Sequence, residues 1–224
     1  MLNENVWIVI PAYNEQQNIF GVVMSLLELT PNIVVVNDGS TDSTQNIIEQ
    51  LDVHLVNHMI NRGMGAALQT GNEYALKQGA EIIVHFDADG QMQAKDIQKI
   101  ISPILENQAE IVFGSRFLDN KSKIPLTKKY FILKPAILFN WFFTGLLLSD
   151  AHNGFRAMSG KAAKRIKLEQ DRMAHATEIL DQVRACDLEF TEIPVEILYQ
   201  EYGQKFSGGF KIIKDLILAK IIRR

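Results

Sequence analysis

The sequence predicts an α/β fold: a single domain built on a mostly parallel sheet flanked by helices. Short apolar runs alternate in the first half of the chain with segments whose apolar residues recur at helical spacing, and this order is typical of βαβ units. The runs lack apolar–polar alternation, which indicates strands covered on both faces. With 224 residues, the chain is long enough for one large domain of this kind.

The expected elements follow in a regular order. Strands are predicted at 6–10, 32–37, 53–57, 81–86 and 109–115, and helices at 15–29, 63–79 and 95–107, with another helix after Gly39. After residue 116 a polar loop leads to an apolar segment at 131–148, a helical stretch that holds Glu178 and a strand-like segment at 188–199.

Composition narrows the class of protein. The formal net charge is −3, which gives no reason to expect a nucleic-acid partner. A single cysteine, Cys186, cannot form an internal disulfide, and this fits a reducing compartment. The N-terminus lacks the basic opening and long apolar run of a signal peptide. These features favour a cytoplasmic protein.

Polar clusters follow four of the predicted strands. They read PAYNE after the first strand, NDGSTD after the second, DADGQ after the fourth and GSR after the fifth. In an open parallel sheet, ligands bind beyond the carboxyl ends of the strands. We therefore expect a binding site along this one edge.

The cluster DADGQ carries the most specific chemistry. Residues i and i+2 of an extended chain point the same way, so Asp87 and Asp89 are expected to converge and to attract a cation. Mg²⁺ is held by one or two carboxylates together with water and phosphate oxygens, and Gln91 offers an amide oxygen. Gly90 permits a sharp turn. A helix-capping turn is the structural alternative.

Six motifs in order resemble family 2 glycosyltransferases. They are VIPAYNEQQNI, VVNDGSTDST, NRGMGAALQTG, FDADGQ, GSR and NGFRAMS, within roughly residues 6–200. The resemblance is closest to the branch of dolichol-phosphate mannose synthase and the bacterial polyprenyl-phosphate sugar transferases. It implies a GT-A fold, a UDP- or GDP-linked sugar donor, Mg²⁺ or Mn²⁺, and inversion at the anomeric carbon.

The resemblance also implies roles for individual residues on the donor side. The residues that it places around the nucleoside are Pro11, Ala12, Tyr13 and Glu15, with Asp38 reading the base, Arg62 and Gly65 near base and diphosphate, and Asp87 near the ribose. Asp89 and Gln91 are implied as metal ligands, and Arg116 and Arg156 as phosphate contacts. Asn37 stands where the family often has another aspartate, which leaves the base open.

Candidate catalytic residues lie on the acceptor side. Asp150 and Glu178 are the two candidates for a general base, with Asp181 a third and His175 an acceptor contact. A turn for Asp150 and a solvated helix face for Glu178 are the structural alternatives. If the acceptor is a lipid phosphate, it is already ionised, so no strong base is needed to activate it.

The expected organisation is a nucleotide-sugar-binding half at 1–116, an acceptor-side half at 117–209 and a basic amphipathic helix at 210–224.

Two segments predict contact with a membrane surface. Residues 131–148 carry one charge, Lys134, and follow a loop with four lysines, while 210–224 mixes Lys and Arg with Ile and Leu. Ordinary packed helices are the alternative.

We expect a transferase peripheral to the inner face of the cell membrane that acts on a polyprenyl phosphate or lipid-linked glycan. A soluble or polysaccharide acceptor and a non-catalytic sugar-nucleotide-binding protein remain alternatives. A nucleotidyltransferase would need a glycine-rich loop after the first strand, and PAYNEQQN lacks one.

Overall fold

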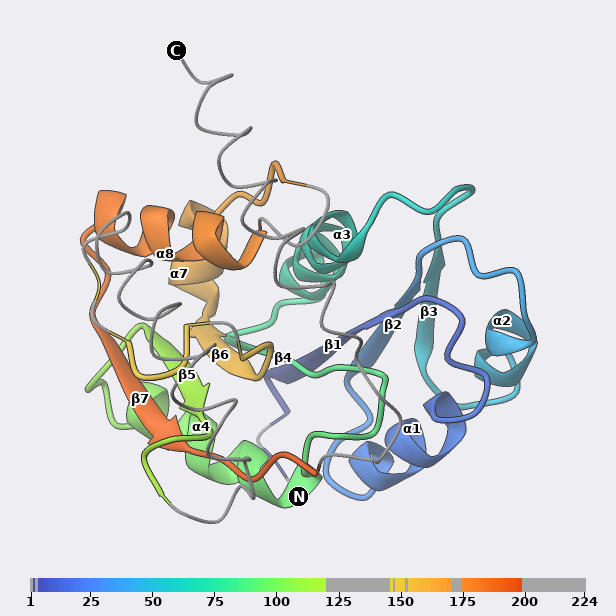
Figure 1. Cartoon of the computed structure of the whole chain (residues 1–224), viewed down its shortest axis with the longest axis horizontal. Helices are drawn as coiled ribbons and strands as arrows, with labels where there is room; N and C mark the ends of the chain where they lie inside the picture. The colour runs from blue at the N-terminus through green and yellow to red at the C-terminus, as the bar shows by residue number, and fades with distance from the viewer. Residues whose placement is uncertain are drawn as a thin grey trace, which may run out of the picture.

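The structure, a computed structural model, describes residues 2, 4–119, 146, 148–151, 153–170 and 175–198. In these residues seven strands form one sheet in the order β3-β2-β1-β4-β6-β5-β7 (Figure 1). The strands are β1 (Val6–Ala12), β2 (Ile33–Asn37), β3 (His54–Asn57), β4 (Ile82–His85), β5 (Ile111–Ser115), β6 (Arg156–Ser159) and β7 (Phe190–Pro194). The helices are α1 (Ile19–Leu27), α2 (Thr44–Ile48), α3 (Met64–Lys77), the 3₁₀ turn η1 (Ala94–Asp96), α4 (Ile97–Leu105), α7 (Gly160–Arg165) and α8 (His175–Ala185).

The sheet is mostly parallel, as the sequence predicts. Strands β3, β2, β1 and β4 pair in parallel, and β5 pairs in parallel with β7. The exception is β6, which lies antiparallel between β4 and β5. Because β6 belongs to the predicted acceptor-side half, the two predicted halves share one sheet.

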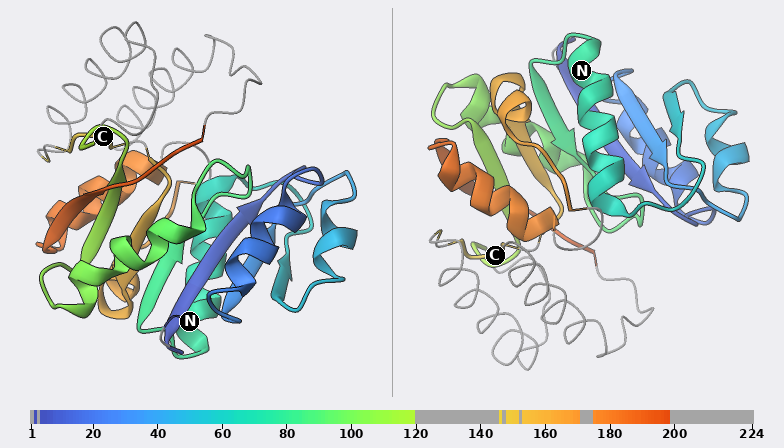
Figure 2. Two further views of the ribbon diagram at one scale, coloured as in Figure 1. Left: turned by 90° about the horizontal axis from the view of Figure 1, so that it is seen from below. Right: turned by 90° about the horizontal axis from the view of Figure 1, so that it is seen from above.

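Helices cover both faces of the sheet, and alternate residues of β1 separate the two cores. Ile8 and Ile10 join the cluster formed with α1 and α4, whereas Trp7 and Val9 join the cluster formed with α3, α7 and α8. Figure 2 shows α1, α2 and α4 in front of the sheet in one view and α3 and α8 in the opposite view. This two-sided burial explains the uninterrupted apolar runs of the central strands.

The predicted strands and long helices are confirmed, with shifts of a few residues at their ends. Helix α1 begins at Ile19 rather than at residue 15, since Glu15 N–H donates to Thr44 Oγ1 at 2.8 Å and fixes a turn. Strand β6 and helix α7 were not predicted. β6 is four residues long and opens with buried Arg156, so it has no apolar run.

Two segments of the sequence are predicted to contact a membrane surface. Residues 210–224 and nearly all of 131–148 lie outside the described part of the chain. Among the helices that are described, none has the length and apolar character needed to cross a bilayer.

Gly71 allows α3 to approach the sheet closely, and this generates a stability prediction. A Cβ at Gly71 would lie 2.2 Å from Val9 Cγ1, on a stiff β-branched side chain. We expect Gly71→Ala to lower the free energy of unfolding by about 1–3 kcal/mol in urea denaturation, because the core must shift.

The matched control is Gly21→Ala in α1. Gly21 is exposed and a Cβ there meets nothing within 4 Å. Alanine should therefore raise stability by about 0.5–1 kcal/mol through its helix propensity. Equal effects of the two substitutions would contradict the close packing of α3 against β1.

Candidate active site

The acidic turn, residues 87–91, follows β4 at the carboxyl edge of the sheet. Gly90 has φ of 75°, a conformation suited to glycine. Gln91 N–H donates to Asp89 Oδ1 at 2.9 Å, and Asp87 N–H lies 3.2 Å from Met92 Sδ. The turn therefore has a defined shape, with Asp87 and Asp89 at its start.

A strap formed by residues 195–198 holds this turn from outside. Leu198 N–H donates to the Gln91 carbonyl at 2.9 Å, and Ile197 forms a β-bridge with Met92. Glu196 pairs with Lys95 at 2.7 Å. No local pattern in the sequence indicates these contacts, because the strap and the turn are about a hundred residues apart.

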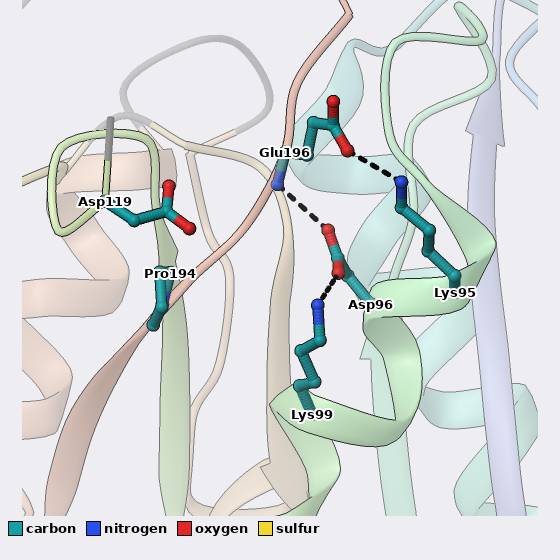
Figure 3. Close-up of a pocket in the computed structure, with 6 residues that line it drawn as sticks. All are labelled: Lys95, Asp96, Lys99, Asp119, Pro194 and Glu196. Carbon is teal, nitrogen blue, oxygen red and sulfur yellow. Dashed lines mark hydrogen bonds and ion pairs between the residues drawn. The ribbon is translucent and has the colours of Figure 1, made fainter. Parts of the chain in front are cut away.

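The strap also closes one side of a pocket of 270 Å³ (Figure 3). Buried Asp96 accepts a hydrogen bond from Glu196 N–H at 2.9 Å and contacts Lys99 Nζ at 2.5 Å. The residues lining the pocket are Lys95, Asp96, Lys99, Asp119, Pro194 and Glu196. Lys95 pairs with Glu196 and Lys99 pairs with Asp96, so these contacts hold the strap against η1 and α4.

The Asp87 carboxylate packs directly on Gly154. A Cβ at Gly154 would lie 2.6 Å from Asp87 Oδ2, so only glycine leaves room for the carboxylate. Loss of solvation, followed by the carboxylates of Asp89 and Glu15, raises the pKa of Asp87 to about 7, against the opposing effect of Arg156 and Arg116.

Glu15, Asp87 and Asp89 thus lie within electrostatic range of one another at this edge. Burial raises the pKa of Asp89 and of Glu15, and Asp89 adds to the rise at Glu15. Glu15 is held by Asn18 Nδ2, which donates to its Oε2 at 2.9 Å. A cluster of like charges whose ionised forms are disfavoured is relieved by a cation.

The donor set fits Mg²⁺ or Mn²⁺ bound partly by a ligand. In the described part of the chain, no three His, Cys, Asp or Glu residues are grouped to hold a metal by themselves. Mg²⁺ commonly takes one or two carboxylates and completes its shell with water and phosphate oxygens. Asp89 and Gln91 lie in the acidic turn where such a metal would bind.

Arg116 and Asp150 form a two-point ion pair at the end of β5. Arg116 Nε and Nη2 each lie 2.6 Å from an oxygen of Asp150, and Arg116 N–H donates to Asp150 Oδ2 at 3.0 Å. Glu192 accepts from the backbone of Ser149 and Asp150. Both oxygens of buried Asp150 are engaged, so the geometry does not present it as a free base.

Arg156 is buried, only 1% exposed, and lies within electrostatic range of Asp87. Its Nη2 and Nε donate to the carbonyls of Asn153 and Gly154 at 3.0 and 3.2 Å. Burial lowers the pKa of Arg156 to about 10, while Asp87 opposes the change. This position differs from the expected phosphate contact, because the guanidinium faces the interior.

Asp38 fastens the loop between β3 and α3. It accepts from His58 Nδ1 at 2.7 Å, from Arg62 N–H at 3.0 Å and from Gly63 N–H at 2.7 Å. The carboxylate is buried, and these bonds differ from the expected contact with a base. A pocket of 390 Å³ lies beside it, lined by Asn37, Gly39, Ser40, Thr41, Gln45, Asn57, His58 and Met59.

The remaining predicted donor residues lie along the same edge. Pro11 and Ala12 form the buried end of β1, and Tyr13 is exposed immediately after them. Arg62 is exposed in the loop before α3. Gly65 is buried in the first turn of α3, where a Cβ would lie 2.0 Å from the Gln170 carbonyl.

Glu178 lies in the first turn of α8 and is buried, not on a solvated helix face. Its Oε2 accepts from the N–H groups of Glu169 and Gln170 at 3.1 and 2.9 Å. His175 is also buried, near Gly65, while Asp181 is half-buried one turn beyond Glu178. Glu178 therefore joins the acceptor-side segment to the start of α3.

Sequence reasoning missed the groups that support these side chains. Gly154 lies within the motif NGFRAMS, but its contact with Asp87 depends on β6 lying beside β4. His85, at the end of β4, bonds buried Asn72 at 2.8 Å. Burial, then Arg156 and His175, lower the pKa of His85 well below its usual value, which keeps it neutral.

Comparison with known proteins identifies one family. The family model described as Glycosyl transferase family 2 matches residues 7–167. A UDP-N-acetylglucosamine–dolichyl-phosphate N-acetylglucosaminyltransferase of Methanococcus voltae is 34% identical, over 99% of this chain and 98% of that protein. A polyprenol monophosphomannose synthase of Mycolicibacterium smegmatis is 27% identical, over 90% of this chain and 81% of that protein.

Solved structures agree on the fold. Glucosyl-3-phosphoglycerate synthase from Mycobacterium tuberculosis, in complex with Mn²⁺, UDP-glucose and phosphoglyceric acid, superposes with a TM-score of 0.71. It is 17% identical, and the match covers 96% of this chain and 79% of that one. The likeness confirms the predicted GT-A fold.

The raised pKa of Asp87 means that its ionised form is disfavoured in the folded chain, and this predicts a pH-dependent stability. Because its pKa is about 7 in the folded chain and lower when unfolded, the folded state binds the extra proton. Stability should therefore fall as pH rises from about 4 to 7. Asp87→Asn cannot ionise, so without divalent cations it should melt at a higher temperature than the unsubstituted chain at pH 8.

The difference in melting temperature should be much smaller at pH 5. Asp52→Asn, at an exposed position, is the control and should shift the melting temperature little at either pH. An Asp87→Asn variant with the same effect at pH 5 and pH 8 would contradict the proposed cost of the Asp87 charge.

Proposed function

Because the chain belongs to glycosyl transferase family 2 and is a glycosyltransferase, we propose that it transfers a sugar from a nucleoside-diphosphate sugar to a polyprenyl phosphate. The observation that carries the proposal is the position of Glu15, Asp87 and Asp89 within electrostatic range of one another at the carboxyl edge of a GT-A sheet. Such a cluster suits a ligand that brings a divalent cation. Inversion at the anomeric carbon and dependence on Mg²⁺ or Mn²⁺ are parts of the proposal.

The donor lies along the carboxyl edge in this proposal. Asp89 and Gln91 hold the metal, which when bound stabilises negative charge on the departing diphosphate. Asp87 faces the ribose, where the ionised carboxylate accepts hydrogen bonds from sugar hydroxyls. The nucleoside is contacted by Pro11, Ala12 and Tyr13, with Arg62 and Gly65 beside it. The base is left open between uracil and guanine.

Arg116 and Arg156 have different proposed roles. Arg116 contacts phosphate oxygens with its planar guanidinium, and Asp150 is its positioning residue rather than the general base. Arg156 acts from the interior as the counter-charge of Asp87. Asp38 is proposed to shape the base site through the β3–α3 loop, since its oxygens are occupied by that loop.

A lipid-phosphate acceptor is supported by the relatives. The Methanococcus voltae protein is named for transfer to dolichyl phosphate, and its likeness spans nearly the whole chain. An ionised phosphate oxygen can attack the anomeric carbon without losing a proton. Glu178 then orients the acceptor side of the site through the 169–170 segment. The protein would work peripherally at the inner face of the membrane.

A lipid-linked glycan or other hydroxyl acceptor is the second candidate. Glu178 supports it, because this carboxylate is buried beside the start of α3 instead of facing solvent. A hydroxyl acceptor would need Glu178 to take its proton during attack. Glu178 is therefore an orienting residue with a lipid-phosphate acceptor and a general base with a hydroxyl acceptor.

Asp89→Asn tests the donor side. We expect transfer from UDP- or GDP-sugars with Mn²⁺ to fall about a hundredfold or more, since loss of metal stabilisation costs several kcal/mol. Chelation of the metal should have the same effect on the unsubstituted chain. Asp52→Asn is the matched control with full activity. Rapid transfer by Asp89→Asn, or in chelator, would overturn the metal-assisted mechanism.

Glu178→Gln separates the two acceptors. Glutamine keeps an oxygen that can accept from residues 169 and 170 but cannot take a proton. With a polyprenyl phosphate, kcat should fall less than about tenfold, whereas loss of a general base on a hydroxyl acceptor should cost about 10²–10⁴-fold. A hundredfold loss of kcat with the lipid phosphate would contradict the favoured acceptor chemistry.

A further inference from the structure

The loop between β3 and α3 carries two exposed apolar side chains at its tip. Met59 is 100% exposed and Ile60 is 70% exposed. We call these two residues the apolar tip. Figure 1 shows the β3–α3 connection projecting beyond the end of β3. Apolar side chains in water are costly, and their removal from water is favourable, so this exposure needs an explanation.

The loop is fixed at both ends. Asp38 contacts His58 on one side of the tip, and it accepts from the N–H groups of Arg62 and Gly63 on the other. Gly39 packs closely on the tip itself, since a Cβ there would lie 2.6 Å from the Ile60 carbonyl carbon. The fold therefore holds the apolar tip outward.

The apolar tip lies on the same edge of the sheet as the acidic turn. Strands β3, β2, β1 and β4 are neighbours and all parallel, so their carboxyl ends share one edge. Three strand spacings of about 4.8 Å separate β3 from β4, or roughly 14 Å. A surface that receives the tip would therefore face the site of transfer.

The size and charge of the loop favour a lipid bilayer as its occupant. Stable protein interfaces bury about 800 Å² on each partner, from 20–30 residues, far more than two side chains supply. A bilayer accepts isolated apolar side chains because it needs no complementary shape. From 53 to 72 the chain has no Asp or Glu and one full cation, Arg62, which suits anionic headgroups.

We propose that Met59 and Ile60 insert into the membrane that carries the acceptor and turn the carboxyl edge of the sheet toward it. The proposal rests on the lipid-phosphate acceptor proposed above. It adds a specific membrane-contacting element to the described fold. The tip limits how the protein can be oriented on the membrane, because Asp38 fixes the loop relative to the sheet.

A site-specific label tests insertion directly. In a Cys186→Ser background, Met59→Cys is labelled with an environment-sensitive fluorophore, with Phe20→Cys on the exposed face of α1 as the control position. On adding phosphatidylcholine–phosphatidylglycerol vesicles to the full chain, we expect a blue shift at residue 59 and none at residue 20. A label at 59 that stays in water while the chain sediments with vesicles would overturn the proposal.

A paired substitution measures the contribution of the apolar tip. Met59→Gln with Ile60→Gln should weaken partitioning onto these vesicles about tenfold or more. Phe20→Gln with Met24→Gln removes another exposed apolar pair, 55% and 45% exposed, from α1 and should leave partitioning unchanged. If the tip variant instead abolished a dimer seen without lipid, the tip would be a protein interface and the proposal would fail.

Measurements of transfer and of membrane insertion on the unsubstituted chain distinguish failure of the tip proposal from failure of the proposed function. Transfer to a short-chain polyprenyl phosphate in detergent, without insertion of residue 59 into vesicles, would overturn only the membrane role of the tip. Absence of transfer to any polyprenyl phosphate would overturn the proposed acceptor and remove the basis for the tip proposal.

Discussion

The contact of the Asp87 carboxylate with Gly154 is the constraint on which the rest of the site depends. It places a negative charge in a poorly solvated position, between the acidic turn and the only antiparallel strand of the described sheet. Asp89 and Glu15 add negative charge nearby. The positive charges of Arg156 and Arg116 partly compensate this arrangement, because both lower the pKa of Asp87.

The two arginines compensate this charge in different ways. Arg156 is fixed by backbone carbonyls of the segment that contains Gly154, so the counter-charge is held by the same segment that packs against the Asp87 carboxylate. Arg116 is fixed by Asp150, which Glu192 in turn holds through the backbone. The negative charge of Asp89 and Glu15 that remains at this edge would be offset by a divalent cation, which would also attract a diphosphate.

Backbone hydrogen bonds to carboxylates shape the site elsewhere as well. Asp38 holds the β3–α3 loop, Glu178 holds the segment at 169–170, and Asp96 holds the strap through Glu196 N–H. Asp38 and Asp96 join segments that come from different βα units, whereas Glu178 holds the connection that precedes its own helix α8. The loops proposed to contact the substrates are thus held by hydrogen bonds to the rest of the fold, which would limit the reorganisation needed when a ligand binds.

The sequence by itself determined the parallel strands, their flanking helices and the edge on which the site lies, because burial on both faces leaves continuous apolar runs and ligand-binding loops follow strand ends. It also predicted that Asp87 and Asp89 share one turn, since their spacing is local. Only the tertiary structure decided that β6 lies between β4 and β5, that Arg156 faces inward and that Asp38 and Asp150 are engaged by their own protein. Those outcomes depend on contacts between residues far apart in the chain, and neither residue type nor periodicity encodes which partner a buried charge will meet.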